Sequence, residues 1–161
     1  MNYIEHMNSI LRPQKTRKEL VLDLFAGAGG LALWLESAGF ETLGFEIDRD
    51  CVVTYSHNLI GRIEQQLLSV NTEYPEAEII IGGPPCQPFS VRGKQDGLHD
   101  IRDGFPAFIA AVEKVQPEIW MFENVRGLMY KNKFYLHQVL GQLADLGYHI
   151  TYRLLNAAHS R

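Results

Sequence analysis

Cys86 is the residue of this sequence whose neighbours most clearly suggest chemistry. It follows three isoleucines at 79–81 and the turn-forming run Gly82-Gly83-Pro84-Pro85. Consecutive β-branched residues predict a buried parallel strand, glycines allow a sharp turn, and prolines fix φ just before the thiol. Functional crevices of open α/β sheets lie beyond the carboxyl ends of their strands. We therefore predict that Cys86 is a nucleophile. The alternative is a buried, inert thiol.

A carboxylate stands at the end of the next predicted strand. The apolar run 119–122 leads directly into Glu123, which Asn124 and Val125 follow. A carboxylate in this position is costly to bury without a partner or a chemical role. Because this strand follows the one that carries Cys86, both side chains could face one pocket. We predict a catalytic role for Glu123, with a helix-cap or loop carboxylate as the alternative.

A glycine-rich turn near the N-terminus indicates a ligand site. The predicted strand 19–25 leads into Ala26-Gly27-Ala28-Gly29-Gly30, then a helix, then a second strand, 42–46, that ends at Glu46. Glycines let a ligand approach the backbone and the helix N-terminus, and Glu46 could accept hydrogen bonds from both hydroxyls of a ribose. The dinucleotide pattern G-x-G-x-x-G is absent, so a dehydrogenase fits poorly. A different ribose-bearing cofactor is favoured.

The remaining pattern predicts alternating strands and helices. Helical spacing and caps predict helices at 31–38, 49–59, 105–115 and 133–146. Apolar runs predict further strands at 76–81, 118–122 and 148–155, with a poorly marked one at 63–70. Such alternation builds an α/β fold with a mostly parallel, Rossmann-like sheet flanked by helices.

The segment 82–104 is predicted to be a long loop beyond the strand that carries Cys86. It contains Arg92, Lys94 and Arg102 among several glycines. Glycine-rich, basic loops of this length are often functional. The loop could close over a polyanion with Arg92 and Lys94 on phosphates, while a merely flexible loop is the alternative.

Composition limits the class of protein. The 161 residues, 46% of them hydrophobic, suit one globular domain, with a lead-in at 1–18 and a catalytic domain at 19–161. No apolar run approaches the ~20 residues that span a bilayer. Two cysteines without C-x-x-C spacing and six scattered histidines indicate neither a disulfide framework nor a metal site, so a reducing cytoplasm, near the nucleoid, is the expected location.

Charge gives only weak support for binding a polyanion. A net charge of −4 argues against gripping nucleic acid with the whole surface. One small basic cluster lies in the lead-in, at Arg12, Lys15, Arg17 and Lys18. We interpret this cluster as a solvated lead-in to the first strand, with a nucleic-acid arm as the alternative.

Four motifs, in order between about residues 20 and 158, give the chain a specific family resemblance. Gly83–Ser90 resembles the catalytic loop of the DNA cytosine-5 methyltransferases, and Asp23–Gly30 resembles their cofactor motif. Glu123-Asn124-Val125 is similar to their acid motif. Asp100-x-Arg102 with Phe105 is similar to the stretch that flanks the cofactor.

The resemblance implies methyl transfer from S-adenosylmethionine to the 5-position of a cytosine flipped out of double-stranded DNA. The Cys86 thiolate would attack the 6-position while Glu123 holds the ring nitrogen, so the site must depress the thiol pKa or couple attack to protonation by Glu123. The implied cofactor contacts are Phe25, Ala26, Gly27, Gly29, Gly30, Glu46, Ile47, Pro84 and Phe105. The implied base pocket is lined by Pro85, Gln87, Ser90 and Val125.

The sequence departs from the family pattern in three places. An aspartate that contacts adenine has no clear match, since Gln66 and its neighbours occupy that place. The family's Gln-x-Arg-x-Arg segment and its target-recognition region are not found in this sequence. We therefore expect the N-terminal catalytic part of such an enzyme, truncated or split, with little or no activity alone. Its open sheet edge would be covered by a second polypeptide, by self-association or by a rearranged C-terminus.

Two other functions stay open. A branch that methylates cytosine in tRNA has a very similar Pro-Pro-Cys-Gln-Pro-Phe loop. A non-catalytic, cofactor-binding subunit of a split methyltransferase is the second alternative. The presence of both Cys86 and Glu123 counts against it.

Overall fold

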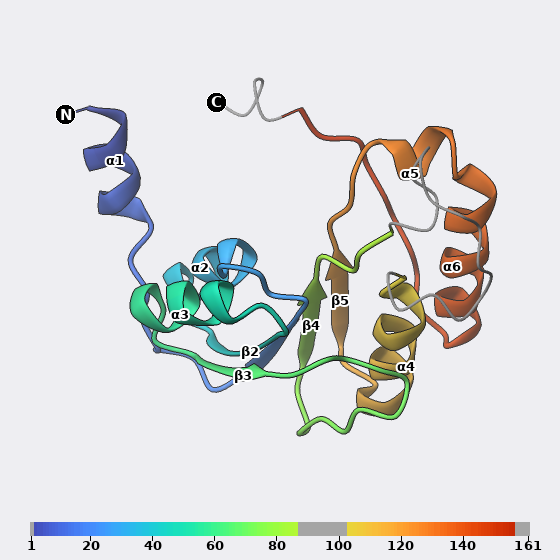
Figure 1. The fold of residues 1–161 in the computed structure, drawn as a ribbon, viewed down its shortest axis with the longest axis horizontal. Helices are drawn as coiled ribbons and strands as arrows, with labels where there is room; N and C mark the ends of the chain where they lie inside the picture. Colours follow the sequence, from blue (N-terminus) through green and yellow to red (C-terminus); the bar gives the residue numbers. More distant parts are fainter. Residues whose placement is uncertain (1, 87–102, 157–161) are drawn as a thin grey trace.

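The computed structural model describes residues 2–86 and 103–156 (Figure 1). The predicted site residues Gln87 and Ser90 lie outside this part, as do most of the predicted loop and its residues Arg92, Lys94, Asp100 and Arg102. The helices are α1 Tyr3–Ile10, α2 Gly30–Ser37, α3 Arg49–Asn58, α4 Phe105–Val115, α5 Gly127–Tyr130 and α6 Lys133–Asp145. The strands are β1 Leu20–Leu24, β2 Glu41–Glu46, β3 Arg62–Gln65, β4 Ile79–Gly82 and β5 Ile119–Phe122.

The five strands form one parallel sheet in the order β3-β2-β1-β4-β5. The chain builds outward from β1 to β3, then returns to place β4 on the other side of β1. The strand order therefore reverses between β1 and β4, which is where open α/β sheets bind ligands. This arrangement confirms the predicted Rossmann-like α/β class.

Helices cover both faces of the sheet (Figure 1). On one face Leu22, Leu24 and Ile80 are fully buried in the main core, which also holds buried side chains of α4 and α6. On the other face a smaller cluster joins Ala32 of α2 to Tyr55 of α3. β-branched and leucine-rich strands buried on both faces explain the continuous apolar runs of β1 and β4.

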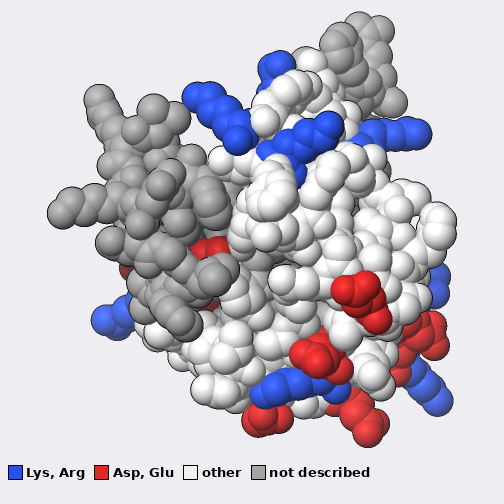
Figure 2. Space-filling view, turned by 90° about the vertical axis from the view of Figure 1, so that its right-hand side faces the viewer, with Lys and Arg blue, Asp and Glu red and all other residues white. Residues whose placement is uncertain are grey.

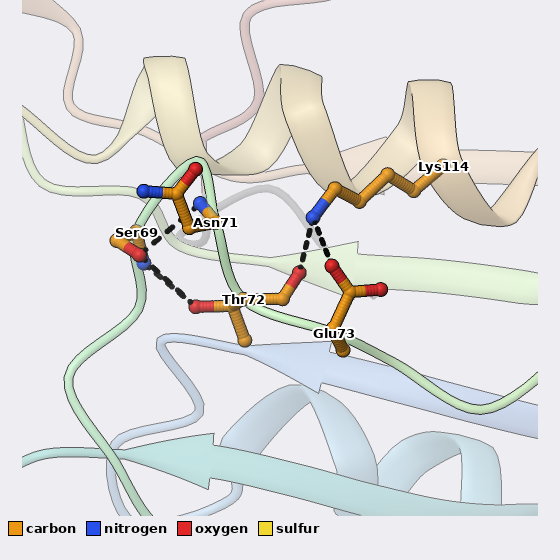
Figure 3. Close-up of polar contacts among 5 residues, drawn as sticks. All are labelled: Ser69, Asn71, Thr72, Glu73 and Lys114. Carbon is orange, nitrogen blue, oxygen red and sulfur yellow. Dashed lines mark hydrogen bonds and ion pairs between the residues drawn. The ribbon is translucent and has the colours of Figure 1, made fainter.

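The connection from β3 to β4 contains a turn where the sequence predicted strand as far as residue 70. The Ser69 backbone N–H donates to Thr72 Oγ1 at 2.9 Å, and the Asn71 N–H donates to Ser69 Oγ at 3.2 Å (Figure 3). Lys114 Nζ, in the last turn of α4, donates to the Thr72 carbonyl at 2.9 Å and pairs with Glu73 Oε1 at 2.7 Å. Hydroxyl side chains that bond their own backbone favour turns over strands, so β3 ends at Gln65.

The sixth strand predicted at 148–155 is wrong. Residues 148–156 are described and contain no strand. Tyr148 instead packs its ring against Trp120 of β5 and donates its hydroxyl to the Pro117 carbonyl at 2.7 Å. Side-chain contacts thus attach this segment to the edge strand β5. An apolar sequence pattern alone does not distinguish such packing from backbone pairing in a sheet.

The lead-in contains a helix that the sequence analysis did not predict. Asn2 and Glu5 form a capping box at the start of α1, each accepting the other's backbone N–H. No helix in the described ranges is long and apolar enough to cross a membrane. Within those same ranges, no group of three or more His, Cys, Asp or Glu side chains could hold a metal ion.

Candidate active site

The turn after β1 takes left-handed backbone conformations. Phe25, Gly27 and Gly29 have φ values of 58°, 54° and 88°. A side chain at Gly29 would collide with Tyr55 and Leu59, so this glycine lets the turn pack closely on α3. At Gly27 an added Cβ would meet no atom within 4 Å. Gly27 therefore borders open space, where a ligand can approach the backbone.

Glu46 holds the ends of β1 and β2 together. Its Oε2 accepts the Gly27 N–H at 2.9 Å, and its Oε1 accepts the N–H groups of Ile47 at 2.8 Å and Asp48 at 2.9 Å. A carboxylate has about four acceptor positions, so roughly one is left, on Oε2 beside the glycine turn. This capacity suits one ligand hydroxyl. A contact to both hydroxyls of a ribose would displace one backbone bond.

Asp23 is buried beneath the same turn. It is 1% exposed, and neither carboxylate oxygen has a hydrogen-bond partner among the described residues. Burial raises its pKa from 3.8 to about 7, the nearby Ala32 N–H offsets this only in part, and Glu46 adds a further small rise. Asp23 therefore gains or loses its charge near neutral pH.

Cys86 lies beyond the carboxyl end of β4, where Asn124 orients its thiol. The Sγ–H donates to Asn124 Oδ1 at 3.0 Å, and Asn124 Nδ2 donates to the Pro84 carbonyl at 2.8 Å. Asn124 Oδ1 also accepts the Val125 N–H at 2.9 Å. One amide side chain thus binds the cysteine loop to the residues after β5.

A second carboxylate stands beside the thiol. Cys86 and Asp103 form an isolated antiparallel bridge, which places their Cα atoms opposite each other. Asp103 Oδ1 accepts the Phe105 N–H at 3.1 Å at the start of α4, and its Oδ2 accepts the Tyr135 hydroxyl from α6. Asp103 therefore connects the cysteine loop to both helices that cover this face.

The glycine turn after β1 and the cysteine loop after β4 meet at Phe25. A Cβ on Gly104 would press against the Phe25 ring and Pro85, so both lie in contact range of that glycine. Phe25 has a positive φ without being glycine, a sparsely populated conformation that surrounding contacts must maintain. The glycine turn and the cysteine loop therefore form one continuous site.

The surroundings of Cys86 disfavour its thiolate. Partial burial raises the pKa of this thiol, and the negative charges of Asp103 and Glu123 raise it further. The sequence analysis gave two ways to activate the thiol. The raised pKa does not fit the first of these, a depressed thiol pKa.

The structure places the other predicted site residues at different depths. Ile47 and Val125 are 57% and 64% exposed, and Glu123 is exposed at the end of β5, where its N–H donates to the Gly82 carbonyl. Pro84 is buried. Phe105 has no exposed surface and packs edge-on against Phe122 and Tyr135, so it lies under the site and would reach a cofactor only if its neighbours moved.

Comparison with known sequences decides the family. A family model described as C-5 cytosine-specific DNA methylase matches residues 20–160. The chain belongs to this family. It is 48% identical to Type II methyltransferase M.AplI of Arthrospira platensis, over 87% of this chain and 41% of that protein. It is 38% identical to Type II methyltransferase M.NaeI of Lentzea aerocolonigenes, over 86% of this chain and 35% of that protein. The chain thus spans about two fifths of the length of these relatives.

Solved structures agree with this methylase fold. A DNMT2 variant from Spodoptera frugiperda is similar with a TM-score of 0.61 and 20% identity, over 80% of this chain and 41% of that one. A SAM-dependent methyltransferase from Agrobacterium tumefaciens gives a TM-score of 0.53 at 17% identity, over 79% and 44% of the two chains. These likenesses show the fold alone.

Sequence reasoning missed three contributors to this methylase's candidate site. Asn124 was quoted only as part of a motif, and neither Asp103 nor Tyr135 was singled out. A short polar residue between Glu123 and Val125 is a weak signal for Asn124. No local pattern connects Asp103 to Tyr135, because the two are 32 residues apart and meet only through the packing of α4 and α6.

Proposed function

We propose that this chain supplies the cofactor site and the nucleophile for methyl transfer from S-adenosylmethionine to the 5-position of cytosine in double-stranded DNA. The observation that carries the proposal is the position of Cys86. Its thiol is oriented by Asn124 at the point where the strand order reverses, next to a glycine turn and Glu46. Family membership supports the reaction type.

The residues around the glycine turn fit the proposed cofactor. Glu46 keeps acceptor capacity on Oε2 for a ribose hydroxyl, and Gly27 borders open space. The partly buried Phe25 and the exposed Ile47 offer apolar surface at the ends of the same two strands. When bound, S-adenosylmethionine supplies the methyl group as an electrophile. The chain's own task is to hold the donor facing the base pocket and to exclude water.

The catalytic residues would act on the base. The Cys86 sulfur forms a bond to the 6-position of a flipped cytosine as the thiol proton passes to water, and Glu123 hydrogen-bonds or protonates the ring nitrogen. This protonation withdraws charge from the ring and favours sulfur attack at the 6-position, and the resulting enamine is nucleophilic at the 5-position. Loss of the 5-proton after methylation then breaks the carbon–sulfur bond and releases the thiolate. Pro85 and Val125 would line the pocket.

The exposed side of β5 bears on the predicted partners. Ile119 and Met121 are 60% and 46% exposed although they belong to an apolar strand. Apolar strand surface of this kind favours contact with further polypeptide. We propose that a second chain or a second copy packs there, and that the chain alone has little turnover. Size-exclusion chromatography of the purified chain tests self-association.

Calorimetric titration with S-adenosylmethionine tests the cofactor site. We expect micromolar binding by the wild type and its loss in Glu46→Ala. Glu64→Ala, on exposed β3, is the matched control and should bind normally. Equal binding by Glu46→Ala and wild type would contradict the cofactor assignment.

A duplex containing 5-fluorocytosine tests the nucleophile, because fluorine at the 5-position cannot leave as a proton does and the adduct persists. We expect a covalent protein–DNA adduct with S-adenosylmethionine that is lost in Cys86→Ser and kept in Cys51→Ser. An adduct with 5-fluorocytosine-containing tRNA in place of DNA would instead support the tRNA alternative.

A further inference from the structure

The segment that follows the candidate base pocket carries positive charge without any acid. Residues 124–135 include Arg126, Lys131 and Lys133 and no Asp or Glu. All three side chains are exposed, and none forms an ion pair with another residue in the part of the chain that is described. The whole chain has a net charge of −4, so this segment differs in sign from the chain as a whole.

A fixed backbone presents these cations outward. Leu128 and Leu136, 3% and 4% exposed, anchor α5 and α6 in the main core. The Lys131 N–H donates to the Gly127 carbonyl at 3.0 Å, which closes the α5 turn. The Arg126 guanidinium lies 4.9 Å from the centre of the Tyr130 ring. Packing therefore fixes the backbone from which the three cations project, and the Tyr130 ring also holds the Arg126 guanidinium.

The cations lie at the end of the sheet that holds the candidate site. In Figure 1 the arrows of β4 and β5 point toward α5. Figure 2 shows Lys and Arg gathered on the upper part of this side of the molecule, and Asp and Glu predominating on the lower part. The net negative charge of the chain therefore does not describe the surface around α5.

We propose that Arg126, Lys131 and Lys133 form a phosphate-binding surface that holds the backbone of the DNA strand carrying the target cytosine. The inference rests on the proposed function. A flipped base stays attached to its strand, which carries one phosphate per nucleotide, so phosphates on either side must lie just outside the pocket. Val125 is a predicted pocket residue, and Arg126 follows it directly. Contacts of this kind position a strand without reading its sequence.

Fluorescence anisotropy with a labelled DNA duplex of mixed sequence tests the proposal on the whole chain. The triple variant Arg126→Gln, Lys131→Gln, Lys133→Gln removes the surface, and Arg12→Gln, Lys15→Gln, Lys18→Gln removes equal charge from the lead-in as the matched control. We expect the first variant to bind on the order of tenfold more weakly or worse at low salt. Its slope of log affinity against log salt should fall by about 2.7, since each phosphate contact contributes roughly 0.9. The control variant should retain most of the affinity for DNA and most of the salt slope.

Three outcomes would overturn the proposal. These are a larger loss in the lead-in variant, no binding of DNA by the wild type, and a loss confined to a tRNA probe. Calorimetry with S-adenosylmethionine on the same variants keeps the tests separate, because the phosphate surface should leave cofactor binding unchanged. Failure of the wild type itself to bind S-adenosylmethionine would instead count against the proposed function.

Discussion

The two halves of the sheet, β1–β3 and β4–β5, hold their polar groups in different ways. Around β1–β3, Glu46 accepts three backbone N–H groups, and buried Glu36 accepts the Thr42 hydroxyl and the N–H groups of Ile60 and Gly61. Around β4, β5 and α4–α6, two bonds join side chain to side chain, Cys86 to Asn124 and Tyr135 to Asp103, beside bonds from Asp103 and Asn124 to the backbone. Backbone donors cannot be substituted away, whereas side-chain partners can. The β1–β3 half is thus a rigid frame for a ligand. In the β4–β5 half, single substitutions can change the contacts around Cys86.

Asp23 is the exception within the rigid frame, because neither of its carboxylate oxygens has a hydrogen-bond partner among the described residues. Its pKa of about 7 in the folded chain lies above the ordinary 3.8, so folding favours the neutral acid. Stability is then full below about pH 4 and is lost as the pH rises through 7, by up to about 4 kcal/mol. Asp23→Asn should remove this loss, and urea unfolding at about pH 5 and pH 8.5 would measure the larger part of it, which falls between pH 5 and pH 7.

The exposed Asp145→Asn serves as the control for charge alone and should unfold as the wild type does at both pH values. Parallel pH profiles for the wild type and Asp23→Asn would show that the buried carboxyl is satisfied in some other way.

Gly29→Ala should break the frame by steric means. The added methyl group would overlap Tyr55 and Leu59 at a backbone φ of 88° that favours glycine. We expect a loss of about 3 kcal/mol in the free energy of unfolding, from overpacking and strain together. Gly30→Ala is the matched control, because its Cβ meets open space at the start of α2. A comparable loss in both variants would argue against a specific contact with α3.

Asn124→Ala should destabilise the β4–β5 half, where this side chain holds the cysteine loop. The change removes the acceptor of the Cys86 thiol and the donor to the Pro84 carbonyl. A loss of about 2 kcal/mol in unfolding free energy is expected for these hydrogen bonds. The exposed Asn71→Ala, which removes no side-chain donor of this kind, should change stability little. If both variants unfold alike, Asn124 does not hold the cysteine loop.

Asp103→Asn should have the smallest effect on stability and a specific effect on reactivity. Removing this negative charge favours the thiolate, so the pKa of Cys86 should fall. In a Cys51→Ser background, the rate of alkylation by iodoacetamide should reach half its maximum at a lower pH. Tyr135→Phe keeps the carboxylate and should not lower that midpoint. An unchanged midpoint in Asp103→Asn would remove Asp103 from the control of the thiol.

Much of the fold followed from short-range pattern. The helix at 105–115 has the predicted bounds; β1 is one residue shorter than predicted at each end, and β2 and β5 differ from their predictions by one residue at the start alone. These segments are strongly apolar and bounded by glycine, proline or polar residues, so local preference and burial agree. At 148–155 the same apolar pattern misled, because whether a segment pairs as a strand depends on what lies at the sheet edge.

What the sequence by itself determined is the class of fold, the family, and the positions of Cys86, Glu46 and Glu123 at strand ends, because periodicity and turn residues are local properties. Only the tertiary structure decided what surrounds them. The burial of Asp23, which has no hydrogen-bond partner among the described residues, depends on how the glycine turn and α2 cover one face of the sheet. The pairing of Asp103 with Tyr135 and the full burial of Phe105 depend on how α4 and α6 pack against the other face. Burial and through-space charge set the pKa of a thiol, and neither can be obtained from spacing along the chain.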